Sequence, residues 1–167
     1  MSQHESIGLS DEWYTPKYIF DALGAIFDMD VAAPISLEHV KTPTDTFITN
    51  RSLEREWKGL VWCNPPFGGR NGIIPWVEKM SYHGNGILLT PDRTSTDWWQ
   101  DCAIKSKGVL FVRSKIKFIK PDGSLGKQPS VGTTLFAFGS QAVAHLLMAQ
   151  ENKLGFFTFN NPYNAKP

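Results

Sequence analysis

Cysteine is scarce in this chain, with two residues among 167, Cys63 and Cys102. Neither a disulfide framework nor a Cys-x-x-Cys metal pair can be built from them, and their surroundings predict buried free thiols. The four histidines, at positions 4, 39, 83 and 145, have no metal-ligand spacing. The sequence therefore predicts a protein that binds no metal ion.

Long apolar runs are absent as well. No stretch approaches the roughly 18 apolar residues that a membrane-spanning helix needs, and the N-terminus lacks the apolar core of a secretion signal. The composition, with 41% hydrophobic, 13% aromatic and 20% charged residues, is nevertheless that of a packed globular protein. We expect a cytoplasmic protein without a membrane partner, formed by one domain over residues 1–167.

Excess charge of one sign is absent from the whole chain, whose net charge is +1, but the basic residues cluster. Residues 105–127 contain seven Lys and Arg against one Asp, a local charge of +6, whereas residues 1–63 contain five against ten. Such clustering is typical of a phosphate-binding surface. Alternation with apolar residues also fits an edge strand whose lysines prevent aggregation; the basic residues concerned are Arg113, Lys115, Lys117 and Lys120.

Helical and strand patterns alternate along the chain. The first helix is expected over residues 16–27, with Thr15 as N-cap and Pro16 at the first helical position. Further helices are expected at 75–83, 94–104 and 141–149, and strands at 28–33, 59–63, 86–90, 109–112, 115–119, 134–139 and 155–159. This order predicts an α/β fold with a mostly parallel sheet and an antiparallel finish, in which ligands bind at the carboxyl ends of the strands.

The strand at 59–63 runs directly into Asn64, Pro65, Pro66 and Phe67. Because proline fixes φ and lacks an N–H, the chain must leave the sheet here as a stiff, extended arm. The Asn64 side-chain oxygen and the Pro65 carbonyl could accept both hydrogens of a planar exocyclic amine, while Phe67 stacks on the attached ring. These contacts would make the amine a better nucleophile and stabilise the positive charge that develops on it.

These four residues resemble the (Asp/Asn/Ser)-Pro-Pro-(Tyr/Phe/Trp) motif of amino-group methyltransferases that use S-adenosylmethionine. The wider pattern is similar to that of phage-type DNA N6-adenine methyltransferases, the Dam-like family. It consists of DEWYTP at 11–16, FDMDVAAP at 27–34, VWCNPPFG at 61–68, LLTPDRTSTDWW at 88–99, VRSKIKFIKPDG at 112–123 and PSVGTTLFAFG at 129–139. The resemblance implies a Rossmann-like sheet with an antiparallel C-terminal strand pair, in a bacterial or phage-infected cell.

The resemblance also implies a reaction, transfer of the methyl group of S-adenosylmethionine to N6 of adenine in DNA. Asn64 and Pro65 would hold and activate the amine, Pro66 would stiffen the loop and Phe67 would stack on the base. An adenine within a duplex cannot reach this arm, so the base would be flipped out or supplied single-stranded. Contacts to DNA would come from Arg93, Arg113, Lys115, Lys117 and Lys120.

Two further elements of the pattern would contact the cofactor. Trp13, Thr15 and Pro16 would lie beside it, and Asp30, Val31, Ala32 and Ala33 would form the first cofactor-binding turn. This turn lacks the glycines usual in methyltransferases of this fold. Asp30 could instead be an exposed acid at an ordinary strand end, with the ribose-binding acid somewhere in residues 34–57.

Other functions remain open at this stage. The same arm serves methyltransferases that act on an RNA base or on protein glutamine, and an inactive nucleic-acid-binding relative would keep the fold alone. The arm could be only a rigid loop, and Arg93 an ordinary exposed arginine. No segment is long enough for a separate recognition domain, so we expect relaxed or short-site recognition of DNA. The oligomeric state cannot be predicted.

Overall fold

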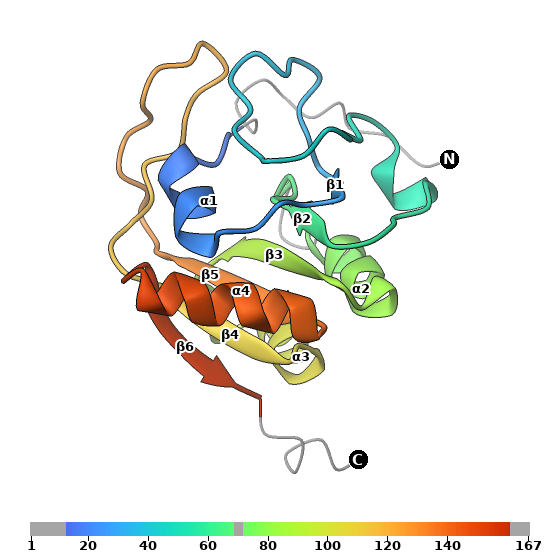
Figure 1. Cartoon of the computed structure of the whole chain (residues 1–167), viewed down its shortest axis with the longest axis vertical. Coiled ribbons are helices and arrows are strands. Elements are labelled where there is room, and N and C mark those ends of the chain that lie inside the picture. Colours follow the sequence, from blue (N-terminus) through green and yellow to red (C-terminus); the bar gives the residue numbers. More distant parts are fainter. Residues whose placement is uncertain (1–12, 69–71, 161–167) are drawn as a thin grey trace.

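The computed structural model describes residues 13–68 and 72–160, which form an open six-stranded mixed sheet between two layers of helices (Figure 1). The order across the sheet is β1-β2-β3-β5-β4-β6. β1, β2 and β3 are parallel, whereas β5 is antiparallel to β3 and β4, and β6 to β4. The bounds are β1 Met29–Asp30, β2 Val61–Cys63, β3 Gly86–Pro91, β4 Gly108–Val112, β5 Thr133–Phe138 and β6 Gly155–Phe159.

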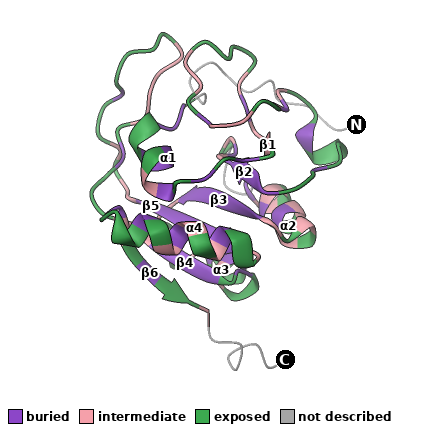
Figure 2. Cartoon of the chain, in the orientation of Figure 1, coloured by how far each residue is buried: buried purple, intermediate pink, exposed green. Residues whose placement is uncertain are grey.

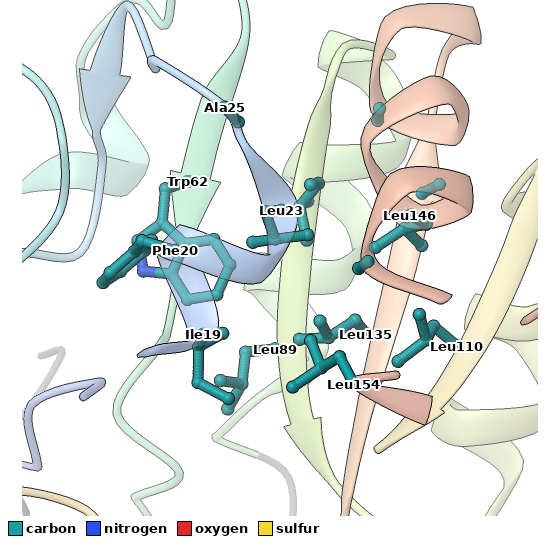
Figure 3. Close-up of a cluster of buried hydrophobic side chains, with 14 of the residues drawn as sticks. Ile19, Phe20, Leu23, Ala25, Trp62, Leu89, Leu110, Leu135, Leu146 and Leu154 are labelled. Carbon is teal, nitrogen blue, oxygen red and sulfur yellow. The ribbon is translucent and has the colours of Figure 1, made fainter. Parts of the chain in front are cut away.

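The helices cover both faces of the sheet. α1 (Lys17–Leu23) and α4 (Ser140–Glu151) pack together on one face, and α2 (Ile74–His83) and α3 (Asp97–Lys105) on the other, with a short 3-10 helix at Ser52–Glu54. Each face has its own apolar cluster because the strand side chains alternate between the two. Figure 3 shows the first cluster, in which α1 and α4 cover Trp62, Leu89, Leu110 and Leu135 of the sheet.

The first helix is shorter than the sequence predicts. It ends at Leu23 because Gly24 adopts a left-handed φ of 59° and donates its N–H to the Phe20 carbonyl. Ile26, which lies within the predicted helix, is outside α1 and 81% exposed. Pro16, not Thr15, stands at the N-cap, which leaves the Thr15 side chain available for other contacts.

The strand predicted at 115–119 is wrong, and with it the interpretation of the basic segment as an edge strand. After β4 the chain leaves the sheet, and Ile119 makes only isolated bridges to Tyr14 and Leu125. The two antiparallel strands expected near the C-terminus are present as β5 and β6, but they are not neighbours because β4 lies between them. Antiparallel pairing of β5 with both β3 and β4 means that β4 runs in the same direction as β3.

Four parallel-running strands therefore end at one edge of the sheet. The long loops after β1 and after β4 both rise from this edge at the top of Figure 1, and the arm after β2 and the turn after β3 start there too. Figure 2 shows that these loops are mostly exposed or half-buried, whereas the strands other than β6 are mostly buried. In the described part of the chain, no helix is both long and apolar enough to cross a membrane.

Candidate active site

The amide of Asn64 is held in one orientation at the end of β2. Its Nδ2 lies 3.0 Å from the Trp13 carbonyl oxygen and 3.2 Å from Thr15 Oγ1. A backbone carbonyl can only accept, so the group facing it must be the NH2 of the amide. Oδ1 is left without a hydrogen-bond partner among the described residues and remains available as an acceptor.

A cleft of about 920 Å³ opens beside Asn64, within the usual size range of small-molecule sites. Aromatic side chains from four segments line it, namely Trp13, Phe67, Trp98 and Phe118. Two cationic side chains, Arg93 after β3 and Lys127 before β5, line the same cleft. Apolar ring faces next to positive charge suit a planar ring that carries a phosphate.

A second, small cavity of about 30 Å³ lies on the Asp30 side of Asn64. Asp30 is only 4% exposed, and its carboxylate accepts hydrogen bonds from Thr42 Oγ1 at 2.6 Å and from the Ala32 N–H at 3.2 Å. Burial raises the pKa of this carboxyl to about 6, and the two hydrogen bonds partly oppose the rise. A buried carboxylate beside a cavity, with no ion pair to a cationic side chain of the described residues, suits a positively charged ligand group.

The structure brings most of the predicted site residues together. Trp13 and Asn64 line both cavities, Phe67 and Arg93 the cleft, and Thr15, Asp30 and Ala32 the small cavity. The interpretation of Asp30 as an exposed strand-end acid is wrong, because the side chain is buried. Four residues predicted for catalysis or cofactor binding line neither cavity, namely Pro16, Ala33, Pro65 and Pro66.

The predicted DNA-contacting residues are more dispersed. Lys120 is half-buried and Arg113, Lys115 and Lys117 are exposed, and none of the four lines the cleft. Lys115 Nζ donates to the Ser130 carbonyl at 3.0 Å, which ties the two ends of the loop after β4 together. Sequence reasoning missed Lys127, although its place in the basic cluster was a usable signal.

Two other site residues, Thr42 and Trp98, were harder to recognise from the sequence. Thr42 lies in a segment without periodicity, and only its bond to Asp30 reveals its role. Trp98 and Trp99 are adjacent on α3, where Trp99 is buried in the core while Trp98 lines the cleft.

A family model described as DNA N-6-adenine-methyltransferase (Dam) matches residues 3–150. The chain belongs to this family. The match covers every element of the motif pattern as well as both cavities, so the enzyme class is that of DNA adenine N6-methyltransferases. A search of curated proteins and a search of solved structures each found no match.

Methyltransferases of this family generally use S-adenosylmethionine, and the residues present fit such a group. The small cavity offers the Asp30 carboxylate for a cationic end, and Ala32 leaves room beside it. This cavity alone is too small for the whole molecule, but the neighbouring cleft beyond Trp13 and Asn64 supplies the space. Within the described residues no group of His, Cys, Asp or Glu could bind a metal ion.

Proposed function

We propose that this protein transfers the methyl group of S-adenosylmethionine to N6 of adenine in DNA by direct transfer, without a covalent enzyme intermediate. The orientation of the Asn64 amide carries the proposal. Because its NH2 is bound by the N-terminal segment, its oxygen is the atom available to a substrate amine. An acceptor at the mouth of an aromatic cleft is what recognition of an adenine amino group requires.

Asn64 Oδ1 and the Pro65 carbonyl accept the two N6 hydrogens in this proposal. Two acceptors favour a pyramidal nitrogen whose lone pair is no longer delocalised into the ring, and they stabilise the positive charge as the nitrogen attacks. The N6 proton is lost after transfer. Pro66 holds the arm rigid, and Phe67, which is 36% exposed, stacks on the adenine ring.

The cofactor contacts lie on the other side of Asn64. S-adenosylmethionine supplies an electrophilic methyl group when it is bound. Asp30 attracts its positive charge, Trp13 and Thr15 flank the cofactor, and the small side chain of Ala32 allows close approach to the backbone. Thr42, in the loop after β1, donates a hydrogen bond to the Asp30 carboxylate and fixes its orientation.

DNA binds across the loops at the carboxyl edge of the sheet in this proposal. Arg93 and Lys127 line the cleft and would contact the phosphates that flank the flipped base. The basic residues of the loop after β4 extend the positive surface outward; these are Arg113, Lys115, Lys117 and Lys120. Sequence recognition is relaxed or limited to a short site, because phosphate contacts carry no base information.

The sheet order supports a Rossmann-like methyltransferase fold in which the whole chain acts as one domain, with the cofactor at β1 and the target amine at β2. Membership of a DNA methyltransferase family favours DNA over RNA or protein glutamine. The intact arm and the free Asn64 acceptor argue against an inactive relative.

Methyl transfer from labelled S-adenosylmethionine tests the proposal, with duplex DNA, single-stranded DNA, RNA and total protein as separate acceptors. We expect label in DNA alone, and digestion to nucleosides should place it in N6-methyladenine. Label in RNA or in protein glutamine would overturn the substrate assignment. Cofactor binding without transfer to any acceptor would support the inactive relative.

A further inference from the structure

The peptide group between Trp13 and Tyr14 connects two distant parts of the site. The Tyr14 N–H donates to the Ile119 carbonyl at 2.9 Å, and the Ile119 N–H returns a bond of 2.9 Å to the Tyr14 carbonyl. A trans peptide is planar, with its N–H and C=O pointing in opposite directions, and no described peptide bond is cis. The Trp13 carbonyl therefore points away from Ile119, and its acceptor faces Asn64.

Several contacts hold this peptide group in place. The hydrogen bond from the Tyr14 N–H fixes its orientation, and the bond that the Ile119 N–H returns to the Tyr14 carbonyl holds the next peptide group. The backbone at Gly126 packs on the Trp13 indole so closely that a Cβ there would lie 2.7 Å from the ring. Thr15, the next residue but one, is 5% exposed and presents Oγ1 to the same Asn64 nitrogen. The two acceptors thus belong to one rigid segment.

We propose that the Trp13 carbonyl and the Thr15 hydroxyl position the Asn64 amide for catalysis and make this site specific for asparagine over aspartate. The inference rests on the proposed function and deepens it. Thr15 is a positioning residue, since it acts through Asn64, and the resemblance assigned it only to the cofactor side. The related motif accepts Asp, Asn or Ser at this position, but in this chain Nδ2 of Asn64 faces the Trp13 carbonyl, which can only accept, and a hydroxyl that accepts from it.

An aspartate at position 64 would meet an unfavourable partner. One carboxylate oxygen would take the place of Nδ2, 3.0 Å from the Trp13 carbonyl oxygen, and two acceptors would face each other. A protonated carboxyl, in contrast, reproduces the amide, because its O–H donates to the carbonyl and its other oxygen faces the cleft. The Asn64→Asp enzyme should therefore regain activity as the pH falls.

Other titratable groups near position 64 must be separated from this effect. Those that line the two cavities are Tyr14, Asp30, Lys41, Arg93 and Lys127. All are present in the wild type too, so the ratio of variant to wild-type rate at each pH isolates residue 64. Thr15 adds a complication, since its hydroxyl can turn and donate to a carboxylate, which lowers the pKa of the carboxyl introduced at this position.

The first test measures single-turnover methylation rates. We expect Asn64→Asp to lose at least about 100-fold near neutral pH, and its rate relative to wild type to rise about tenfold for each pH unit of acidification. Thr15→Val should lose about 3- to 10-fold, the effect of one hydrogen bond, and Thr15→Ser should restore the rate. Thr90→Val is the matched control, because Thr90 is fully buried and its hydroxyl has no described partner.

The second test does not depend on activity. The carboxyl introduced at position 64 is titrated by carbon NMR in Asn64→Asp and in the double variant Asn64→Asp with Thr15→Val. We expect a pKa above the ordinary value of about 3.9, and a higher one in the double variant, where only the Trp13 carbonyl faces the carboxyl. An ordinary or lowered pKa in the double variant would overturn the inference, as would wild-type rates for Asn64→Asp at neutral pH. If the wild type methylates nothing, the proposed function fails, but this titration still decides the positioning.

Discussion

Asp30→Asn should stabilise the protein while it weakens cofactor binding. In the folded chain burial raises the pKa of Asp30 to about 6, well above its value of 3.8 in an exposed carboxyl. Because this carboxyl is harder to ionise in the folded protein, it keeps its proton to a higher pH there than in the unfolded chain. The protonated Asp30 carboxyl therefore adds to the free energy of unfolding. This contribution is fully present below about pH 4 and is lost as the pH rises to about 6.

The size of this stability change follows from the two pKa values of Asp30. A difference of about two pH units corresponds to about 3 kcal/mol of unfolding free energy at pH 8. Asparagine keeps the local geometry, since its Oδ1 can accept from the Ala32 N–H and its Nδ2 can donate to Thr42 Oγ1. We expect Asp30→Asn to be more stable than wild type by about 1 to 3 kcal/mol at pH 8, and no more stable at pH 4.

Urea unfolding at both pH values measures the stability change, and calorimetric titration with S-adenosylmethionine measures the loss of binding. Wild-type affinity for the cofactor should itself fall about tenfold for each pH unit below 6, because only the ionised carboxylate attracts the cation. A variant that is less stable than wild type at pH 8, or that binds the cofactor unchanged, would refute the reasoning. Asp30 would then stabilise the fold rather than bind a ligand.

Three further predictions concern the base, the DNA backbone and the core. Phe67→Ala should lower kcat/KM for DNA by about 5- to 150-fold through lost stacking, with an unchanged Tm because the ring is partly exposed; normal kinetics would contradict its role. Lys127→Gln should reduce the slope of log Kd against log salt by about one, whereas Lys58→Gln, which changes a lysine that lines neither cavity, should not. Leu146→Ala removes a fully buried side chain between α4 and the sheet and should cost about 2 to 5 kcal/mol in urea unfolding without a change in kcat.

The core of the site could be predicted because it is local to strand ends. Asn64 and Phe67 follow β2 directly, and Asp30 ends β1, so a parallel pairing of these strands brings them to one edge. Short buried strands and amphipathic helices could also be predicted, because their apolar patterns are continuous in the sequence. The motif pattern then connected them to a family, which the family match confirms.

What could not be predicted depends on contacts between distant loops. The segment at 115–119 has a strand-like alternation, but Ile116 is buried against the first apolar cluster and Ile119 pairs with Tyr14 instead of extending the sheet. Thr42 and Lys127 lie in loops, and only the folded chain places them beside Asp30 and the cleft. The orientation of the Asn64 amide could not be predicted either, because it depends on the Trp13 carbonyl, 51 residues earlier in the chain.

The central claim is that the Asn64 oxygen activates the amino group of adenine. Single-turnover methylation of unmethylated DNA by wild type and by Asn64→Ala, with N6-methyladenine measured after digestion, tests it most directly. Cofactor affinity and Tm of the two proteins are compared in parallel. The account predicts N6-methyladenine from the wild type and a loss of at least about 100-fold in the variant, with both proteins folded and similar in cofactor binding. Equal rates from the two proteins would contradict it.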